Sequence, residues 1–89
     1  MINNNVKREY FNLILKYEYK HWLNISMHEY LSEDFIREFK DKVDWYYISI
    51  YQDLSEDFIR EFKNEVNWYN ISVNQNLSNN FKEEFKEYL

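Results

Sequence analysis

The chain repeats one pattern of hydrophobic and polar positions three times. Tryptophan recurs every 23 residues, at Trp22, Trp45 and Trp68. The same order of apolar, small and acidic residues follows each tryptophan, most completely in residues 45–67. A fixed period of this length is typical of a repeat array, in which each unit buries its apolar face against the next. The sequence predicts one domain, residues 1–89, with units at 22–44, 45–67 and 68–89.

Each unit is predicted to contain two helices. Asp44 is expected to cap a short helix from Trp45 to about Gln52, because aspartate accepts hydrogen bonds from the first amides of a helix. Ser55 is expected to cap a second helix over about residues 56–66, with two acidic residues in the first turn, where the helix dipole favours them. The equivalent caps in the other units are Ser32, Asn67 (for residues 68–75) and Ser78.

Two other folds compete for the same pattern. Residues 46–51, YYISIY, are rich in strand-forming residues and nearly alternate. The third unit argues against a strand, because its WYNISVNQN keeps Trp, Ile and Ser but introduces several asparagines. A coiled coil fails because 23 is not a multiple of 7 and cap residues interrupt each unit. The expected fold is therefore all-α, a solenoid-like stack of about seven short helices.

Residues 1–21 are expected to form an N-terminal capping helix. Asn5 would cap a helix from about Val6 to Lys20. Its apolar stripe is predicted to consist of Phe11, Ile14, Leu15 and Tyr19. The same i, i+4, i+8 spacing occurs in the second helices, so this segment looks like the second half of an incomplete leading unit.

Composition narrows the functional classes. The chain of 89 residues carries 16 acidic and 11 basic residues, and it contains no Gly, Pro or Cys. Without cysteine there are no disulfides or thiolate metal sites, and without glycine there is no phosphate-binding loop of the P-loop or dinucleotide type. A net charge of −5 disfavours binding along a nucleic-acid backbone. No apolar stretch approaches the ~20 residues of a membrane span, and the start does not look like a signal peptide, so we expect a cytoplasmic protein with no membrane contact.

No catalytic constellation is recognisable. The only histidines, His21 and His28, lie seven residues apart and offer fewer ligands than a zinc site needs. The recurring serines Ser26, Ser49 and Ser72 have no histidine repeated beside them, so we interpret them as small residues that allow close helix contact. We therefore expect a protein that is not an enzyme and that uses no cofactor and no metal.

The second helices carry charges of both signs on the side expected to face solvent. The i, i+4 pairs predicted there are Glu33–Arg37, Glu56–Arg60 and Glu38–Lys42. Pairs of this kind are typical of a solvated helix face. An acidic face that mimics nucleic acid is the alternative, weakened by the interspersed Lys and Arg. Its residues would be Glu61, Glu65, Glu83, Glu84 and Glu87.

Aromatic residues that differ between units are candidates for binding a partner. The recurring Trp, Phe and Ile are assigned to the core, whereas positions that change from unit to unit need not serve packing. Tyrosine is enriched at protein interfaces. Stacking of single-stranded RNA on these rings is a weaker alternative, because a basic groove is missing. The predicted partner-binding residues are Tyr46, Tyr47, Tyr51, Asp53 and Asn70.

The second unit also resembles a known short tandem repeat of pattern W-x-x-I-S-x-x-Q-x-L-S-E-x-F-I-x-x-F. Such repeats occur in proteins of large DNA viruses and of AT-rich, low-GC bacteria and their phages. The matching residues are Trp45, Ile48, Ser49, Gln52, Leu54, Ser55, Glu56, Phe58, Ile59 and Phe62. The first unit departs at Glu29, and the third at Asn79 and Lys82. The resemblance covers residues 22–89 and implies helical repeats without catalytic residues.

By analogy, this resemblance and the short chain imply a small phage anti-defence protein. Such proteins include inhibitors of CRISPR nucleases, and the partner suggested here is a type VI, RNA-guided RNA nuclease. The alternatives are a structural or scaffold repeat protein without inhibitory role and, less favoured, a single-stranded RNA binder. We also expect a homodimer through the C-terminal end, where Phe85, Tyr88 and Leu89 have no following unit to cover them.

Overall fold

The computed structural model describes residues 3–16, 22–28 and 30–89, and within these ranges the only regular secondary structure is α-helix. The helices are α1 Asn4–Lys16, α2 Trp22–Ser26, α3 Glu33–Glu38, α4 Trp45–Tyr51, α5 Glu56–Glu61, α6 Trp68–Asn74 and α7 Asn79–Glu84. The all-α prediction with about seven short helices is confirmed for the part of the chain described. Residues 46–51 form helix α4, so the strand alternative is wrong.

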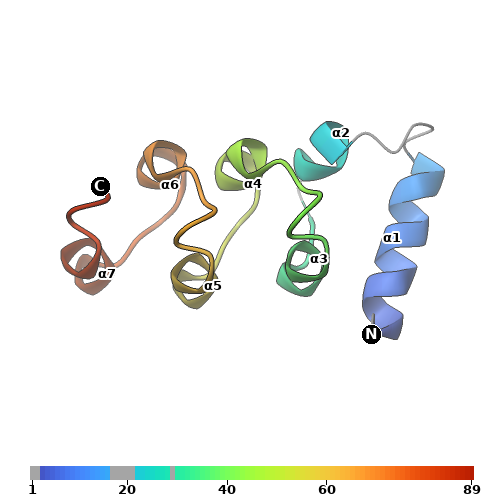
Figure 1. Cartoon of the computed structure of the whole chain (residues 1–89), viewed down its shortest axis with the longest axis horizontal. Helices are drawn as coiled ribbons and strands as arrows, with labels where there is room; N and C mark the ends of the chain where they lie inside the picture. The colour runs from blue at the N-terminus through green and yellow to red at the C-terminus, as the bar shows by residue number, and fades with distance from the viewer. Residues whose placement is uncertain (1–2, 17–21, 29) are drawn as a thin grey trace.

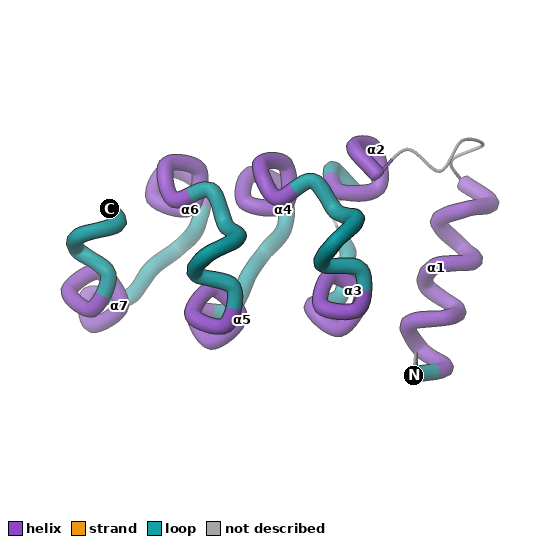
Figure 2. Tube along the Cα trace, viewed as in Figure 1, coloured by secondary structure: helices purple, strands orange, loops and turns teal. Residues whose placement is uncertain are grey.

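The helices form two parallel rows with α1 lying across one end (Figures 1 and 2). Helices α2, α4 and α6, the first helices of the units, pack side by side in one row. Helices α3, α5 and α7 form the other row. The body measures 41 × 23 × 19 Å, and its radius of gyration of 13.6 Å exceeds the roughly 12 Å of a compact chain of this length. The stack therefore grows in one direction, as expected of repeats.

The helices begin at the predicted caps. Asp44 Oδ1 accepts hydrogen bonds from the N–H groups of Tyr46 and Tyr47, and Ser55 Oγ accepts one from Phe58 N–H. Asn67, Ser32 and Ser78 cap α6, α3 and α7 in the same way. Side-chain oxygens at these positions satisfy amides that the first turn of a helix leaves without partners.

The second helices are shorter than predicted. Helix α5 ends at Glu61, where the sequence predicts a helix to about Val66. The N–H groups of Glu65 and Val66 both bond to the Phe62 carbonyl, so residues 62–66 form tight turns. Phe62 and Val66 are still buried, because these turns keep the apolar spacing that suggested a longer helix.

Aromatic rings join the two helices of each unit. Trp45 lies with its ring centroid 5.1 Å from that of Phe62, which is 4.7 Å from that of Phe58. The indole Nε1 of Trp45 donates to the Lys40 carbonyl at 3.0 Å. The same cluster recurs around Trp22 and Trp68. Each tryptophan thus packs over the end of its own second helix, which explains its strict 23-residue period.

Helix α1 buries a different stripe from the predicted one. Its cap is Asn3, not Asn5, because Asn3 Oδ1 accepts from Val6 N–H at 2.8 Å. Val6 and Leu13 are buried, whereas Phe11 is 61% exposed, so the prediction of Phe11 as a core residue is wrong. The reason is orientation: α1 crosses the end of the stack instead of lying parallel to α3 (Figure 1). The predicted continuation to Lys20, with Tyr19, and the side chains of Ile14 and Leu15 lie outside the described residues.

One glutamine per junction joins a unit to the unit before it. Gln52 Oε1 accepts from Leu31 N–H at 3.1 Å, and its Nε2 donates to the carbonyls of Ser26 and His28. Gln52 is only 2% exposed. The equivalent Gln75 bonds to Leu54 N–H, Ser49 O and Gln52 O at 3.1, 3.0 and 2.7 Å. Each glutamine thereby satisfies backbone groups in the loop that follows the preceding first helix.

The recurring serines have a polar role that their small size did not reveal. Ser26 Oγ accepts from Asp44 N–H at 2.7 Å, and Ser49 Oγ accepts from Asn67 N–H at 3.0 Å. Both serines are buried, whereas Ser72 is exposed. Each buried serine therefore holds the N-cap residue of the next unit, in addition to allowing close contact between the helices.

We predict that Gln52→Met will lower the free energy of unfolding by about 3 kcal/mol, because methionine keeps the volume but leaves buried backbone groups unpaired. The matched control is Gln75→Met, which removes equivalent bonds at a half-exposed position where water can replace them, for a loss of about 1 kcal/mol. Urea denaturation followed by circular dichroism measures both. Equal losses in the two variants would contradict this account of the junction.

Candidate partner-binding surface

Three of the five predicted partner-binding residues lie on α4, Asp53 lies two residues after it, and Asn70 lies in α6. Tyr46 is 51% exposed, Tyr51 and Asp53 are exposed, and Tyr47 is half-buried. Asn70 is 5% exposed within α6, so its assignment to a contact surface is wrong. It occupies the third position of its helix, as Tyr47 does in α4, and that position faces the interior of the stack in the third unit.

The α4 tyrosines form one cluster. The rings of Tyr46 and Tyr47 meet edge to face with centroids 5.1 Å apart, and the rings of Tyr47 and Tyr51 stack at 6.2 Å with an interplanar angle of 11°. Tyr47 and Tyr51 are one helical turn apart, which places them on the same side of α4. Ring contacts hold these side chains in defined positions before any partner arrives.

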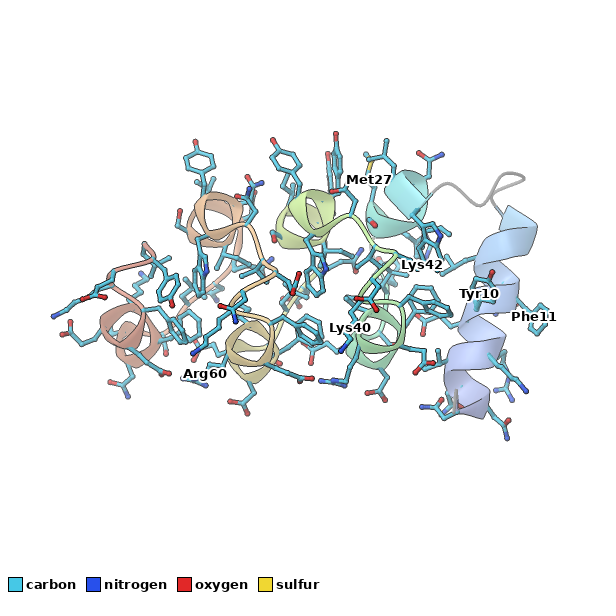
Figure 3. All side chains as sticks on the ribbon, viewed as in Figure 1. Tyr10, Phe11, Met27, Lys40, Lys42 and Arg60 are labelled. Carbon is cyan, nitrogen blue, oxygen red and sulfur yellow. The ribbon has the colours of Figure 1, made fainter. Side chains whose placement is uncertain are left out.

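This cluster belongs to a longer uncharged surface. The second and sixth positions counted from each tryptophan are mostly apolar and, except for the half-buried Ile50, exposed. They lie on one side because they are four residues apart. Side chains project from that side of all three helices in Figure 3. We call this surface the first-helix face and define it by Leu23, Met27, Tyr46, Ile50, Tyr51, Tyr69 and Val73. Helices α2, α4 and α6 contain no charged residue.

Sequence reasoning missed Leu23, Met27, Tyr69 and Val73 as surface residues. The signal was present, because these residues are at the same repeat positions as Tyr46 and Ile50. The prediction considered only residues that differ between units, and most of those it chose lie on α4. The property that extends over all three units is the absence of charge, which the identity of single residues does not reveal.

The row of second helices is charged, but its ion pairs differ from those predicted. Arg37 forms a bidentate pair with Glu61 of the next unit, with both N···O distances 2.8 Å, and a pair with Asp34 at 2.7 Å. Arg60 repeats this arrangement with Glu84 and Asp57. The predicted pairs Glu33–Arg37 and Glu56–Arg60 are not among the ion pairs of the described residues, and neither is Glu38–Lys42. The planar guanidinium instead matches a carboxylate across the junction.

The first glutamates of the second helices bind the serine caps of the following units. Glu56 accepts from Ser78 N–H at 2.6 Å and from its hydroxyl at 2.9 Å, and Glu33 binds Ser55 in the same way. Glu9 of α1 accepts the same two hydrogen bonds from Ser32, so α1 makes the contact that the second helix of a preceding unit would make. The hydrogen bonds from Ser78 hold the pKa of Glu56 below its ordinary value of 4.5, and the Arg37 guanidinium lowers that of Glu61.

These contacts weaken the interpretation of an acidic face that mimics nucleic acid. Glu61 and Glu84 are neutralised by arginines, so they do not present free carboxylates. Glu65, Glu83 and Glu87 are exposed. Of these three, Glu83 is paired with Lys86 at 3.2 Å. The remaining free acidic charge is scattered rather than arranged along a line.

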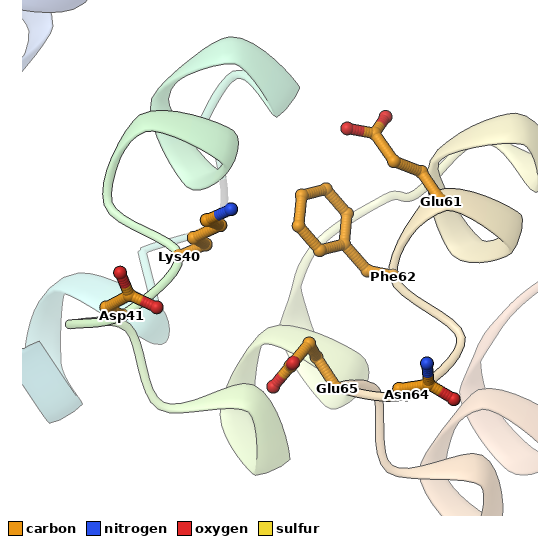
Figure 4. Close-up of a pocket in the computed structure, with 6 residues that line it drawn as sticks. All are labelled: Lys40, Asp41, Glu61, Phe62, Asn64 and Glu65. Carbon is orange, nitrogen blue, oxygen red and sulfur yellow. The ribbon is translucent and has the colours of Figure 1, made fainter.

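A shallow polar depression of about 230 Å³ lies between the turns that follow α3 and α5 (Figure 4). Its lining is Lys40, Asp41, Glu61, Phe62, Asn64 and Glu65. The turn after α3 contributes the amine of Lys40 and the carboxylate of Asp41, and the end of α5 with the turn after it contributes two further carboxylates. The lining contains neither a histidine nor a nucleophile. Among the residues that the structure describes, no group of His, Cys, Asp or Glu is placed to hold a metal ion. His21 lies outside the described residues.

The C-terminal end exposes less apolar surface than predicted. Phe85 is buried, and Tyr88 packs on Trp68 with ring centroids 4.9 Å apart. Tyr88 and Leu89 remain partly exposed. The expected dimer surface is therefore reduced to these two side chains.

Comparisons with known proteins add no relative: no family model, no curated protein and no solved structure matches the chain. None of the described helices has the length and apolar character needed to cross a membrane.

We predict that acid will weaken the stack through its inter-unit carboxylates. A carboxylate whose pKa is lower in the folded chain than in the unfolded chain stabilises the fold at any pH above its unfolded-state pKa. This stabilisation is lost as the pH falls through its folded-state pKa. The melting temperature should be constant from neutral pH to about pH 5 and fall below it. A Glu56→Gln/Glu61→Gln variant should melt lower at neutral pH and show a flatter acid response.

Glu87→Gln is the matched control, because Glu87 forms no hydrogen bond or ion pair with the described residues. Its acid response should equal that of the unmodified chain. An unchanged acid response in the double variant would show that other groups cause the loss of stability.

Proposed function

We propose that this chain is a non-catalytic protein-binding repeat module that contacts its partner with the first-helix face. The supporting observation is the row of three helices without charge, whose exposed positions carry tyrosine, methionine and aliphatic side chains. The cores of protein interfaces are depleted in charge and enriched in tyrosine and methionine. The rest of the surface, which holds all the charged residues of the three units, has the opposite character.

The dimensions and rigidity of the stack support the same use. The side of the body that carries this row measures about 41 by 19 Å with α1 included, which is comparable with the roughly 800 Å² that one partner contributes to a stable complex. The stacked Tyr47 and Tyr51 rings are already ordered, so binding would cost them little conformational entropy. Tyrosine also combines large contact area with few rotatable bonds. The surface is therefore suited to a large, flat contact.

Charge indicates the kind of partner. The chain carries a net charge of −5, and the exposed Asp53 follows directly after α4. A net negative charge beside an uncharged surface favours a basic partner, both in encounter rate and in specificity. Enzymes that process nucleic acids have basic surfaces along the path of the nucleic acid. Together with the repeat resemblance, this leads us to propose a bacterial type VI CRISPR nuclease as the partner, inhibited in the bacterial cytoplasm.

We predict that Tyr46→Ala will weaken binding by about 30-fold, because a tyrosine at the centre of an interface contributes about 2 kcal/mol. Tyr51→Ala should act similarly. Isothermal titration against purified type VI effectors measures the affinity, and cleavage of a reporter RNA measures inhibition. Phe11→Ala is the matched control, since Phe11 is an equally exposed ring that points away from the stack on α1 (Figure 3).

The outcomes separate the parts of this proposal. Inhibition that survives both tyrosine substitutions would reject the surface. Absence of binding to every effector tested would reject the partner class. Binding to single-stranded RNA with a steep salt dependence would favour the RNA-binding alternative instead.

A further inference from the structure

The end of each of the first two first helices, with the loop after it, forms a hydrogen-bonding template for a glutamine carboxamide, although the second carbonyl lies one repeat position later in the second unit. It consists of one backbone N–H that donates to a carboxamide oxygen and two carbonyls that accept from the carboxamide nitrogen. In the first unit these groups are Leu31 N–H, Ser26 O and His28 O, and in the second they are Leu54 N–H, Ser49 O and Gln52 O. Gln52 occupies the first template and Gln75 the second.

The third unit repeats this template. Its groups are Leu77 N–H, Ser72 O and Gln75 O, at the positions that bind glutamine in the second unit. Among the described residues, no side chain of the chain bonds to them. Since the same loop binds a glutamine carboxamide in both preceding units, the third loop has the geometry for the same ligand group.

Ser72 adds an acceptor beside this template. The hydroxyl of the equivalent Ser49 donates to the Trp45 carbonyl at 2.7 Å and accepts from the N–H of Asn67, the N-cap of the next first helix. Ser72 Oγ donates to the Tyr69 carbonyl at 2.7 Å, three residues back instead of the four residues back seen for Ser49. Its lone pair is oriented by that bond and is exposed, so it can accept from the backbone of an incoming helix.

The apolar side of α6 continues the established interface. Helix α2 packs on α4, and α4 packs on α6, which ends the row (Figure 1). Tyr69 and Val73 are 74% and 62% exposed, more than their equivalents Tyr46 and Ile50 in α4. A helix laid along α6 would cover them as α6 covers the residues of α4.

The neighbouring α7 does not offer the same continuation. In the first two units, a glutamate, a buried isoleucine and an arginine of the second helix contact the unit that follows. In α7 these positions are Asn79, Lys82 and Glu83, all exposed. The side of α6 therefore accepts a helix, whereas the side of α7 lacks the contacts that hold a second one. The edge fits a single short helix, not a whole repeat unit.

We propose that the free side of α6 binds one short helix of a partner protein, whose glutamine side chain fills the third carboxamide template. In both internal junctions the glutamine lies eight residues after the N-cap residue that bonds to the serine. The partner helix should therefore have a cap residue followed by glutamine at this spacing. A second copy of this chain does not meet the requirement, because Gln52 and Gln75 are both engaged and the first unit has Glu29 at this position. The site shares Tyr69 and Val73 with the first-helix face, but it does not include the α4 tyrosines.

The test is a titration of the ¹⁵N-labelled full chain with an acetylated peptide of the sequence of residues 66–77. Progressive shifts of the Leu77 amide resonance are expected, because its N–H gains a hydrogen bond. The same peptide with methionine in place of its glutamine should bind about tenfold more weakly, since it cannot form the carboxamide bonds. Ser72→Val in the labelled chain should also weaken binding, and its exposed position leaves the fold intact.

Tyr46→Ala is the matched control and should leave this binding unchanged, which distinguishes this site from the α4 tyrosines on which the proposed function depends. A Leu77 resonance that stays in place at millimolar peptide would overturn the proposal, as would equal affinity of the two peptides. Shifts confined to the α4 tyrosines would also overturn it. A dimer of the chain in sedimentation experiments that Ser72→Val abolishes would replace the partner helix with a second copy.

Discussion

The stack depends on satisfying the backbone of the loop between the two helices of each unit. That loop contains no glycine or proline, and it leaves one N–H and two carbonyls without partners inside the unit. A glutamine from the next unit supplies all three bonds with a single side chain. Since unpaired buried backbone groups are costly, a unit is complete only when another unit lies against it. This constraint explains why the glutamine recurs together with the tryptophan and the serine.

The two rows of helices divide the remaining tasks. The second helices carry the charges, and these charges are largely used to connect one unit to the next through Arg–Glu pairs and Glu–Ser hydrogen bonds. The first helices pack directly on one another and need no such bridges, so their outer side is free of charge. The absence of charge on this surface thus follows from the way the stack is assembled. A partner would impose requirements only on which uncharged side chains occupy it.

The two ends of the stack are finished differently. At the N-terminal end, α1 covers the first unit and supplies Glu9 to the Ser32 cap, although it crosses the stack at another angle. At the other end, α7 replaces its inter-unit residues with exposed polar ones, while α6 keeps the template of an internal junction. The N-terminal edge is therefore covered by α1. At the other edge, α7 lacks the inter-unit contact residues, whereas α6 retains the junction template.

The sequence by itself determined the repeat period, the helical class and the starts of α3 to α7, because these depend on local caps and on apolar spacing within a few residues. It also pointed to Tyr46 and Tyr51 as exposed. It could not place Phe11 or Asn70, whose burial depends on how α1 crosses the stack and on which side of α6 faces the junction. The partners in neighbouring units of Arg37, Glu56 and Gln52 lie more than 20 residues away in the chain. Only the tertiary structure decided these contacts, since stacking brings together residues that local rules pair with nearer neighbours.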